Sequence, residues 1–274
     1  MRPTTKIVLG GILFIYIISL VLIICFSFSE RRYYKNFVFG DINIPNENLT
    51  AIDLEPYHTV ILEEVMSQAK SIMSYTNRNV LRINPISVGG ENKLVIPESL
   101  RGCIAIKTHD DTLKIQLMTE ELRIEFGKGY ENYLNFSGID LCLHSSTVDV
   151  INKIDNFRTI VSDIETEVVK IVSGGAILIE SCKAIDIEIA PSISRSCFLS
   201  VKNTVAKTIN IDLDVIDMKL EEGCEIEEKN LTGGKRHIIE LERKDRGKIN
   251  WYPKNSEAEL AITVPGDTVQ IIFQ

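Results

Sequence analysis

The sequence predicts an all-β protein, and the architecture it favours is a parallel β-helix (a solenoid) behind one N-terminal transmembrane helix. From about residue 94 to the end, short runs alternate apolar and polar residues, which is typical of strands half buried against a core. Tight hairpin signals such as Asn-Gly and Asp-Gly are absent there, which favours a coil of strands over a meander. An antiparallel β-sandwich is the alternative, because the spacing of the strands fits both folds.

The N-terminal stretch departs sharply from the average composition of 45% apolar and 25% charged residues. Residues 7–28 form an unbroken run without a charge, between Arg2 and Lys6 on one side and Glu30, Arg31 and Arg32 on the other. As a helix this segment would be about 33 Å long, enough to cross a hydrocarbon layer of about 30 Å. We therefore expect a short cytoplasmic tail at 1–6 and an uncleaved transmembrane signal anchor at 7–28, which contacts membrane lipid.

Two other interpretations of the segment remain open. Ser27 and Ser29 would suit a signal peptide cut before Glu30, although the apolar run is longer than such peptides need. A lipoprotein signal requires a small residue before its cysteine, whereas Ile24 precedes Cys25. Positive charge is nearly equal on both sides, so the orientation rests on the short tail at 1–6, which has no room for a function of its own. We expect the N-terminus to be cytoplasmic and the C-terminal domain extracytoplasmic.

The regions after the anchor differ in how regular they are. Residues 29–56 show no sustained period and suggest a stalk or linker, followed by an extracytoplasmic β-helical domain at 57–274. Residues 57–84 fit one helical face as well as strands, and strands are favoured at both ends of this stretch. This stretch and the segment around Trp251 are candidates for caps over the exposed ends of the stack.

The predicted strands follow from the two-residue alternation. Leu113, Ile115 and Leu117 alternate with polar residues, and so do the apolar residues of 122–126 and of 209–215. The remaining predicted strands are 104–106, 133–136, 139–143, 148–151, 158–164, 168–172, 177–181, 185–190, 197–201, 218–220, 224–231, 238–242, 260–264 and 269–273.

A coil of about 20 residues would stack these strands as rungs about 4.8 Å apart over one column of aliphatic side chains. Four cysteines fit that length, since Cys103, Cys142, Cys182 and Cys224 follow one another at nearly equal intervals, each close to two such coils. Such a spacing predicts that they recur on one inward face at every second turn. The five cysteines outside the anchor are an odd number, and we interpret them as free buried thiols.

The run "KLVIPESLRGCIAIKTHDDTLKIQL", followed by "SGG" and by "IDLDV" behind an N-terminal anchor, resembles the GIN-type adhesin-head domain family of Bacteroidetes. The resemblance covers roughly residues 58–274. It implies a parallel β-helix exposed outside a membrane, without assigned catalytic residues. The sparse glycines and the long N-terminal stretch depart from the family's pattern, so the resemblance does not define the register of the first turns.

No motif in the sequence predicts a catalytic, cofactor-binding or metal site. Adjacent acidic residues on one face of a solenoid would suit a glycoside-cleaving enzyme, and the candidates are Asp186, Glu188, Asp212 and Asp214. The acidic run 221–228 lacks the spacing of a calcium loop, and Asp110 and Asp111 suit a turn.

Trp251 and Tyr252 are the residues we single out as ligand contacts, because aromatic rings stack on sugars. The net charge of −8 argues against a nucleic-acid partner, which would need a clustered basic surface. The function we expect is that of a non-catalytic adhesion, binding or envelope-scaffold module with a cell-envelope glycan or protein as partner. A carbohydrate-active enzyme is the alternative, and a sensor that reports to a membrane partner is a third.

Overall fold

The computed structural model describes residues 39–65, 72–87, 90–127, 133–192, 196–241, 247–264 and 270–273, and most of these residues lie in strands. The prediction of an all-β protein is confirmed. The predicted tail at 1–6 and anchor at 7–28 lie outside the described residues. Within the described ranges, no helix has both the length and the apolar character that a membrane crossing requires.

The elements follow one another along the chain as short strands with one 3-10 helix and one α-helix. They are β1 (Phe39–Asn43), β2 (Leu49–Asp53), β3 (Thr59–Val65), β4 (Ile72–Tyr75), β5 (Val80–Asn84), β6 (Lys93–Pro97), η1 (Glu98–Cys103), β7 (Ile104–His109), β8 (Thr112–Met118), α2 (Thr119–Phe126), β9 (Tyr133–Ser137), β10 (Asp140–His144), β11 (Val148–Asn152), β12 (Arg158–Ser162), β13 (Glu165–Ser173), β14 (Ile177–Glu180), β15 (Lys183–Pro191), β16 (Cys197–Lys202), β17 (Val205–Asp212), β18 (Ile216–Leu220), β19 (Glu225–Gly233), β20 (Arg236–Glu240), β21 (Lys248–Pro253), β22 (Glu259–Thr263) and β23 (Gln270–Phe273).

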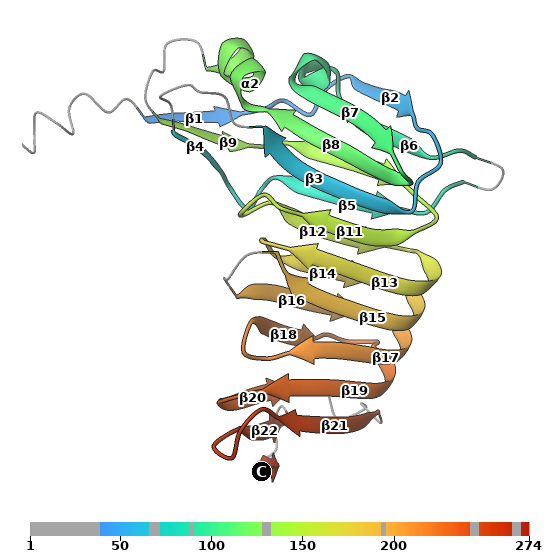
Figure 1. Ribbon diagram of the computed structural model, residues 1–274, viewed down its shortest axis with the longest axis vertical. Coiled ribbons are helices and arrows are strands. Elements are labelled where there is room, and N and C mark those ends of the chain that lie inside the picture. The colour runs from blue at the N-terminus through green and yellow to red at the C-terminus, as the bar shows by residue number, and fades with distance from the viewer. Residues whose placement is uncertain are drawn as a thin grey trace, which may run out of the picture.

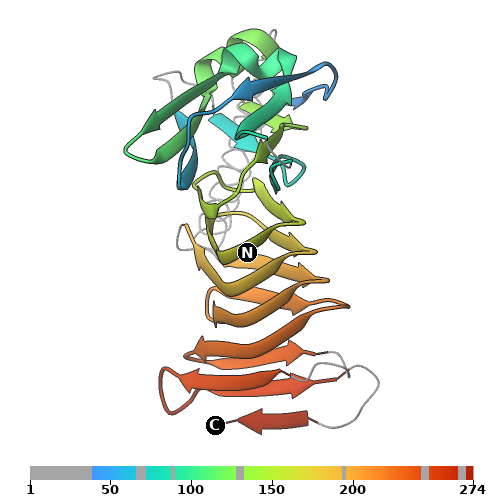
Figure 2. The same ribbon diagram turned by 90° about the vertical axis from the view of Figure 1, so that its right-hand side faces the viewer.

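Two large sheets run along the molecule, and from β10 to β19 the chain alternates between them. The first has the order β18-β16-β14-β12-β5-β10-β6-β2, and the second has the order β21-β19-β17-β15-β13-β11-β3-β8-β7. Two three-stranded sheets, β1-β9-β4 and β20-β22-β23, complete the described part. Figures 1 and 2 show an elongated body in which β11–β21 stack below a broader N-terminal end.

From β11 to β21 every pairing within the two large sheets is parallel, and we call residues 148–253 the parallel region. Val169 lies beside Ile187, and Ile187 lies beside Ile209. Ile209 in turn lies beside Lys229 on the next rung. Each of these steps advances the chain by about 20 residues, which agrees with the predicted repeat.

A repeated turn carries the chain from the first sheet to the second. Asp163, Ser181, Asn203 and Gly223 each have a positive φ, between 48° and 78°, at successive copies of this turn. The backbone N–H of Ser181 donates to the carbonyl of Lys202 at 3.0 Å, and the two flanking turns are joined in the same way. The turns therefore stack, because asparagine, aspartate and glycine tolerate the left-handed conformation and every turn satisfies the polar groups of the next.

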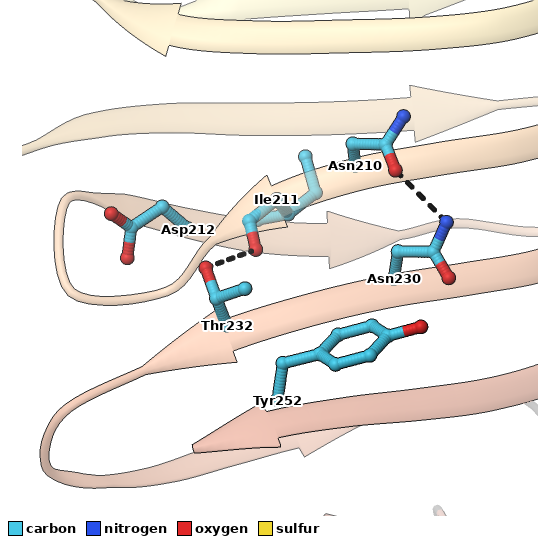
Figure 3. Close-up of a pocket in the computed structure, with 6 residues that line it drawn as sticks. All are labelled: Asn210, Ile211, Asp212, Asn230, Thr232 and Tyr252. Carbon is cyan, nitrogen blue, oxygen red and sulfur yellow. Dashed lines mark hydrogen bonds between the residues drawn. The ribbon is translucent and has the colours of Figure 1, made fainter. Parts of the chain in front are cut away.

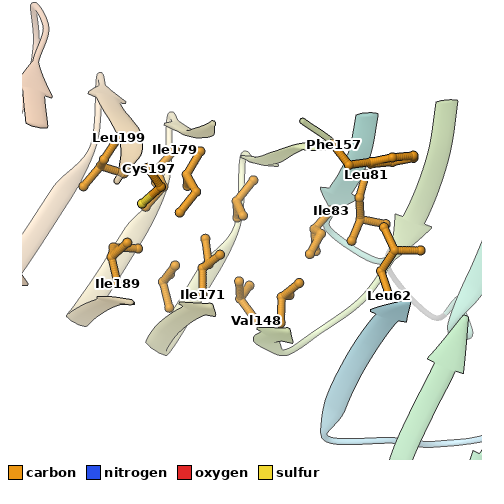
Figure 4. Packing of buried hydrophobic residues seen from close by; sticks show 14 of the residues in the cluster. Leu62, Leu81, Ile83, Val148, Phe157, Ile171, Ile179, Ile189, Cys197 and Leu199 are labelled. Atoms are coloured by element: carbon orange, nitrogen blue, oxygen red, sulfur yellow. The ribbon is translucent and has the colours of Figure 1, made fainter. Parts of the chain in front are cut away.

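The core lies between the two large sheets. Figure 4 shows two facing rows of side chains, with Leu81, Phe157, Ile179 and Leu199 in one and Val148, Ile171 and Ile189 in the other. Burial of these aliphatic and aromatic groups stabilises the fold by about 25 cal/mol for each Å² of apolar surface removed from water.

Lys229 departs from the predicted aliphatic column, because its side chain is fully buried in the column that contains Ile209. Its ammonium donates a hydrogen bond to the carbonyl of Ile226 at 3.1 Å. This contact gives the buried charge a polar partner, which burial in an apolar surrounding requires.

The N-terminal end is built differently from the prediction. β3 and β5 lie inside the two large sheets rather than over their ends, since β3 pairs with both β8 and β11 and β5 pairs with both β10 and β12. β7 and β8 form an antiparallel hairpin at the edge of the second sheet. Asp110 and Asp111, both with positive φ, form its two-residue turn, so a hairpin occurs here without the Asn-Gly or Asp-Gly signal.

The strand predicted at 122–126 is wrong, because these residues belong to α2. Leu122 is buried while Ile124 is 56% exposed, so the alternation of apolar residues does not correspond to two faces of a strand. Arg123 forms an ion pair with Glu120 three residues earlier, a spacing that brings side chains together on a helix. The prediction failed because the same short pattern also fits one turn of an amphipathic helix.

Part of the stretch expected to be a stalk takes part in the sheets. β1 pairs with β9, and β2 pairs with β6, so both strands pair with segments that lie far along the chain. The residues of β2 alternate only between exposed and half-buried, so this strand carries a weak apolar pattern.

The cysteines share one structural column only in part. The register places Cys182, Thr204 and Cys224 at equivalent positions directly after the stacked turns, so two of the four cysteines lie two rungs apart as predicted. Cys182 and Cys224 donate to the carbonyls of Glu180 and Val201 at 3.3 and 3.2 Å. Cys103 lies in η1 and Cys142 in β10, outside this column. None of the five cysteines in the described ranges forms a disulfide.

Candidate functional site

The two aromatic residues singled out from the sequence lie on opposite faces of β21, as neighbours on a strand must. Trp251 points towards the core beside Leu231, and its ring meets the His237 ring edge-on with a centroid distance of 6.3 Å. Gly233 leaves room for the indole, because a Cβ there would lie 2.8 Å from it. Tyr252 points outwards and is 53% exposed, whereas Trp251 is half-buried, so Tyr252 is the more exposed ring of the two.

Three asparagines form a ladder on the outer face of the second sheet next to Tyr252. Asn210, Asn230 and Asn250 are register partners on β17, β19 and β21. The Nδ2 of Asn250 donates to Oδ1 of Asn230 at 2.8 Å, and the Nδ2 of Asn230 donates to Oδ1 of Asn210 at 2.9 Å. The amides therefore all point the same way, one on each rung, and Figure 3 shows the contact between Asn210 and Asn230.

A second column completes an open depression of about 420 Å³ on this face. Asp212, Thr232 and Tyr252 are register partners two positions after the three asparagines on the same strands. Thr232 Oγ1 donates to the carbonyl of Ile211 at 3.4 Å, which fixes the hydroxyl and leaves the methyl group beside the tyrosine ring (Figure 3). Asn210, Asn230, Asp212, Thr232 and Tyr252 line this depression, and Asn250 continues the asparagine ladder beside it. We call these six residues the outer groove.

An ion-pair network lies at one end of the outer groove. The ammonium of Lys254 contacts both carboxylate oxygens of Asp212 at 2.7 Å and Oδ2 of Asp214 at 2.9 Å. Asp214 also accepts hydrogen bonds from the Gly234 N–H and pairs with Nε2 of His237 at 2.9 Å. The Gly234 N–H, then Lys254 and His237, hold the pKa of Asp214 well below its usual range. The two carboxylates hold the pKa of Lys254 above its usual value, Asp212 most strongly.

The four acids considered for hydrolysis do not pair with one another across adjacent rungs, although Asp212 and Asp214 lie close together at the same Lys254 ammonium. Thr208 is the register partner of Asp186 and donates a hydrogen bond to its carboxylate, and Asn210 is the partner of Glu188. Asp212 lies beside Thr232 on the next rung. Asp214 remains ionised over the whole neutral range because its pKa is lowered, so it is unsuited to donate a proton to a leaving group.

The acidic run 221–228 is distributed around a turn and onto β19. Glu221 accepts a hydrogen bond from the Ser200 hydroxyl at 2.7 Å, and this bond, with Lys219 and Lys202 nearby, lowers the pKa of its carboxyl group. Glu225 and Glu227 are exposed on β19. Within the ranges that the structure describes, no group of three or more His, Cys, Asp and Glu side chains converges as metal ligands would.

The asparagine ladder was missed at the sequence level, although a signal for it exists. The segments "NID", "NLT" and "NWY" begin at positions 210, 230 and 250, so an asparagine recurs at a constant interval. That interval equals the length of a coil, and equal positions of successive coils stack. Aligning the strands by this interval would have predicted the ladder.

Comparison with known proteins gives only distant similarities. No family model matches the chain, and no curated protein does. Among solved structures, a "putative adhesin" from Parabacteroides merdae ATCC 43184 is similar with a TM-score of 0.38 and 13% identity, over 82% of this chain and 95% of that one. A second "putative adhesin", from Parabacteroides distasonis ATCC 8503, has a TM-score of 0.35 and 12% identity, over 83% and 98% of the chains.

A third solved structure is a "putative lipid binding protein", also from Parabacteroides distasonis ATCC 8503. Its TM-score is 0.30 and its identity 11%, over 84% of this chain and 98% of that one. Similarities this distant leave the function of this chain to be argued from its own residues.

Proposed function

We propose that this chain is a single-pass membrane protein whose β-solenoid domain lies outside the membrane and acts as a non-catalytic binding, adhesion or envelope-scaffold module. The observation that carries the proposal is the outer face of the parallel region. Equal positions on successive rungs hold polar side chains that bond to one another, as in the asparagine ladder and in the Thr208–Asp186 contact. Such a face is a rigid surface with a regular repeat, which suits contact with a partner molecule.

The solenoid interpretation rests on register. The rungs of the second sheet from β11 to β21 pair in parallel at intervals of about 20 residues, and the turns between the sheets stack on one another. An antiparallel sandwich would instead place neighbouring strands of each sheet in opposite directions.

A cross-linking experiment tests this register. Lys170 and Glu188 are partners on the outer face of β13 and β15, and neighbouring strands are about 4.8 Å apart, within the range of a disulfide. The double variant Lys170→Cys/Glu188→Cys should form a cross-linked peptide pair that mass spectrometry detects under mild oxidation. The control Lys170→Cys/Ile189→Cys should not, because Ile189 points into the core. Equal cross-linking in both variants, or none in the first, would contradict the parallel register.

Membrane anchoring is supported by the uncharged residues 7–28, and the orientation is part of the proposal. The full chain should sediment with membranes after extraction at alkaline pH. Protease added outside intact cells should remove the domain that follows the anchor. Release by alkali, or protection from the external protease, would overturn the anchoring and the orientation respectively.

The binding function is tested with the full chain reconstituted in lipid nanodiscs. We expect it to bind isolated cell-envelope material, with a glycan or a protein as the contact, and to release no reducing ends from polysaccharide. Turnover of a polysaccharide that is lost in Asp212→Asn, while folding is kept, would overturn the non-catalytic assignment. Failure of the wild-type chain to bind any envelope fraction would overturn the binding role.

A further inference from the structure

The outer groove has unused hydrogen-bonding capacity arranged at regular intervals. A side-chain amide offers two N–H donors and two acceptor lone pairs. Asn230, in the middle of the ladder, uses one donor towards Asn210 and one lone pair towards Asn250. One N–H and one lone pair of this residue therefore remain for a ligand, and the ladder itself fixes the amide in place.

Tyr252 adds an apolar surface at the same place. Its ring is 53% exposed, lies on the strand that ends the second sheet, and borders the methyl group of Thr232 (Figure 3). An exposed aromatic face attracts the C–H groups of a flat apolar surface, because the face of the ring carries partial negative charge. A ligand that combines such a surface with many hydroxyl groups matches both halves of the outer groove.

The direction of the outer groove limits the shape of the ligand. The asparagine column crosses three strands at about 4.8 Å per rung, so it runs along the length of the molecule rather than along a strand. One rung is close to the length of one pyranose unit in an extended chain. An extended oligosaccharide can therefore present successive units to successive asparagines.

Charge limits the ligand further. Asp212 shares the Lys254 ammonium with Asp214, and Glu188 and Glu228 border the ladder on the same face. The whole chain carries a net charge of −8. An anionic ligand would be repelled by these carboxylates, so the groove suits a neutral one.

We propose that the outer groove binds a neutral, β-linked oligosaccharide, with Tyr252 stacking on a sugar ring and Asn230 and Asn250 hydrogen-bonding its hydroxyl groups. β-1,4-linked glucose or N-acetylglucosamine chains fit, because their equatorial substituents leave each ring face flat and apolar. α-1,4-linked chains curve away from a straight column. This inference deepens the proposed function and rests on it.

Two other depressions carry less of an argument. The one of about 230 Å³ beside His237 and Asp214 is lined by groups that already bond to each other. The one of about 500 Å³ between Lys202 and Glu240 has charged walls, with Lys202 already paired to Glu180. Neither presents an exposed aromatic ring.

Binding of defined trisaccharides to the full chain in nanodiscs tests the proposal. Calorimetry with cellotriose and chitotriose should give binding, whereas maltotriose and trigalacturonate should bind more weakly or not at all. Tyr252→Ala should weaken binding about fivefold to tenfold and Tyr252→Trp should retain it. Asn230→Ala should weaken binding by a similar factor through the loss of one hydrogen bond.

Phe198→Ala is the matched control, because Phe198 is an aromatic residue of similar exposure, 44%, on the other large sheet. This variant should bind the trisaccharides as the wild type does. Circular dichroism of all variants shows whether the fold is kept, and Tyr252→Trp tests the ring without removing it. Equal loss in Phe198→Ala and Tyr252→Ala, or no effect of either, would place the sugar elsewhere and overturn the proposal.

The failure of this inference is distinguishable from that of the proposed function. If the wild-type chain binds envelope material but neither cellotriose nor chitotriose, the groove assignment is wrong and the binding role stands. If envelope binding is itself unchanged in Tyr252→Ala, the contact lies on another face. If the wild-type chain binds neither, both proposals fall.

Discussion

The parallel region and the N-terminal end share two sheets and one core but are assembled by different rules. In the parallel region a strand pairs with a strand about 20 residues further along the chain. At the N-terminal end, Val60 lies between Leu113 and Val150, and both partners are several coil lengths away in the sequence. In the first arrangement every pair of strands closes a short loop of similar length. In the second, several pairs of strands close long loops.

This difference explains why one region is regular and the other is not. When every rung closes a loop of similar length, equivalent positions of neighbouring strands lie above one another. Similar side chains can then recur at the same position on successive rungs. The stack of parallel strands stops at the N-terminal end. The backbone N–H and C=O groups at that edge therefore need other partners. Antiparallel strands, a hairpin, η1 and α2 occupy that edge, which otherwise would expose unpaired backbone groups.

The largest expected effect on stability comes from removing one buried core side chain in each region. Ile209→Ala in the parallel region and Leu113→Ala at the N-terminal end each remove a fully buried side chain, and each should lower the free energy of unfolding by about 2–5 kcal/mol. Urea denaturation measures this. The rates should differ: Ile209→Ala should slow folding because its contacts are short-range, and Leu113→Ala should mainly speed unfolding.

Ile185→Ala is the control, since Ile185 is on β15 of the parallel region and 48% exposed. It should change the free energy of unfolding by about 0.5 kcal/mol or less. Folding rates slowed equally by Ile209→Ala and Leu113→Ala would mean that both regions form together in the transition state.

The second-largest effect on the free energy of unfolding is expected in the stacked turns of the parallel region. Gly223 has φ +78°, and a Cβ there would lie 2.2 Å from Oδ1 of Asn203 in the turn above. Gly223→Ala should therefore destabilise by about 1–3 kcal/mol, measured by urea denaturation. Asn203→Gly, at the equivalent position with φ 48°, should change the free energy of unfolding by only a few tenths of a kcal/mol. Similar losses in both variants would contradict the stacked left-handed turn.

The network at the end of the parallel region should make stability depend on pH. The pKa of Asp214 is lowered in the folded protein, so its contribution is present above the unfolded value near 3.8 and is lost as the pH falls below it. Asp214→Asn should cost about 1–2 kcal/mol at pH 7, and the difference from the wild type should shrink below about pH 4. A difference that stays constant down to acidic pH would show that the charge of Asp214 contributes nothing.

The smallest effect is expected from the ion pair on the N-terminal end. Arg82 and Asp140 are 3.0 Å apart, and the arginine side chain is 41% exposed. Arg82→Met should lower the free energy of unfolding by about 1 kcal/mol or less, with the loss disappearing in high salt. A larger loss that survives high salt would show that Arg82 acts through packing rather than through its charge.

How far the sequence predicts the structure follows the same division between the regions. The alternation of residues predicts β13, β15, β17 and β19, because each of these strands buries one face and they follow at a nearly constant interval. It overextends the strand predicted at 209–215, because β17 ends at Asp212 and residues 213–215 form a turn. It fails at 122–126, where three apolar residues fit a helix as well as a strand. It placed a turn at Asp110 and Asp111 but did not predict that this turn closes an antiparallel hairpin, since two aspartates with positive φ stand where a glycine signal was expected.

The candidate site divides in the same way. The sequence singled out Trp251 and Tyr252 as ligand contacts, but only the strand register shows which of the two rings is more exposed. It named four acids that are close along the chain, and only the register shows that Thr208, Asn210 and Thr232 lie beside three of them. The fourth acid, Asp214, shares the Lys254 ammonium with Asp212.

By itself, the sequence determined that the described chain is built of short half-buried strands with a repeat of about 20 residues, because local alternation and spacing depend only on neighbouring residues. Only the tertiary structure decided which strands lie side by side at the N-terminal end, where Lys229 is buried, and that three asparagines on successive coils form one ladder. The reason is physical. Contacts between rungs depend on register, and one residue of slip would turn every side chain to the opposite face.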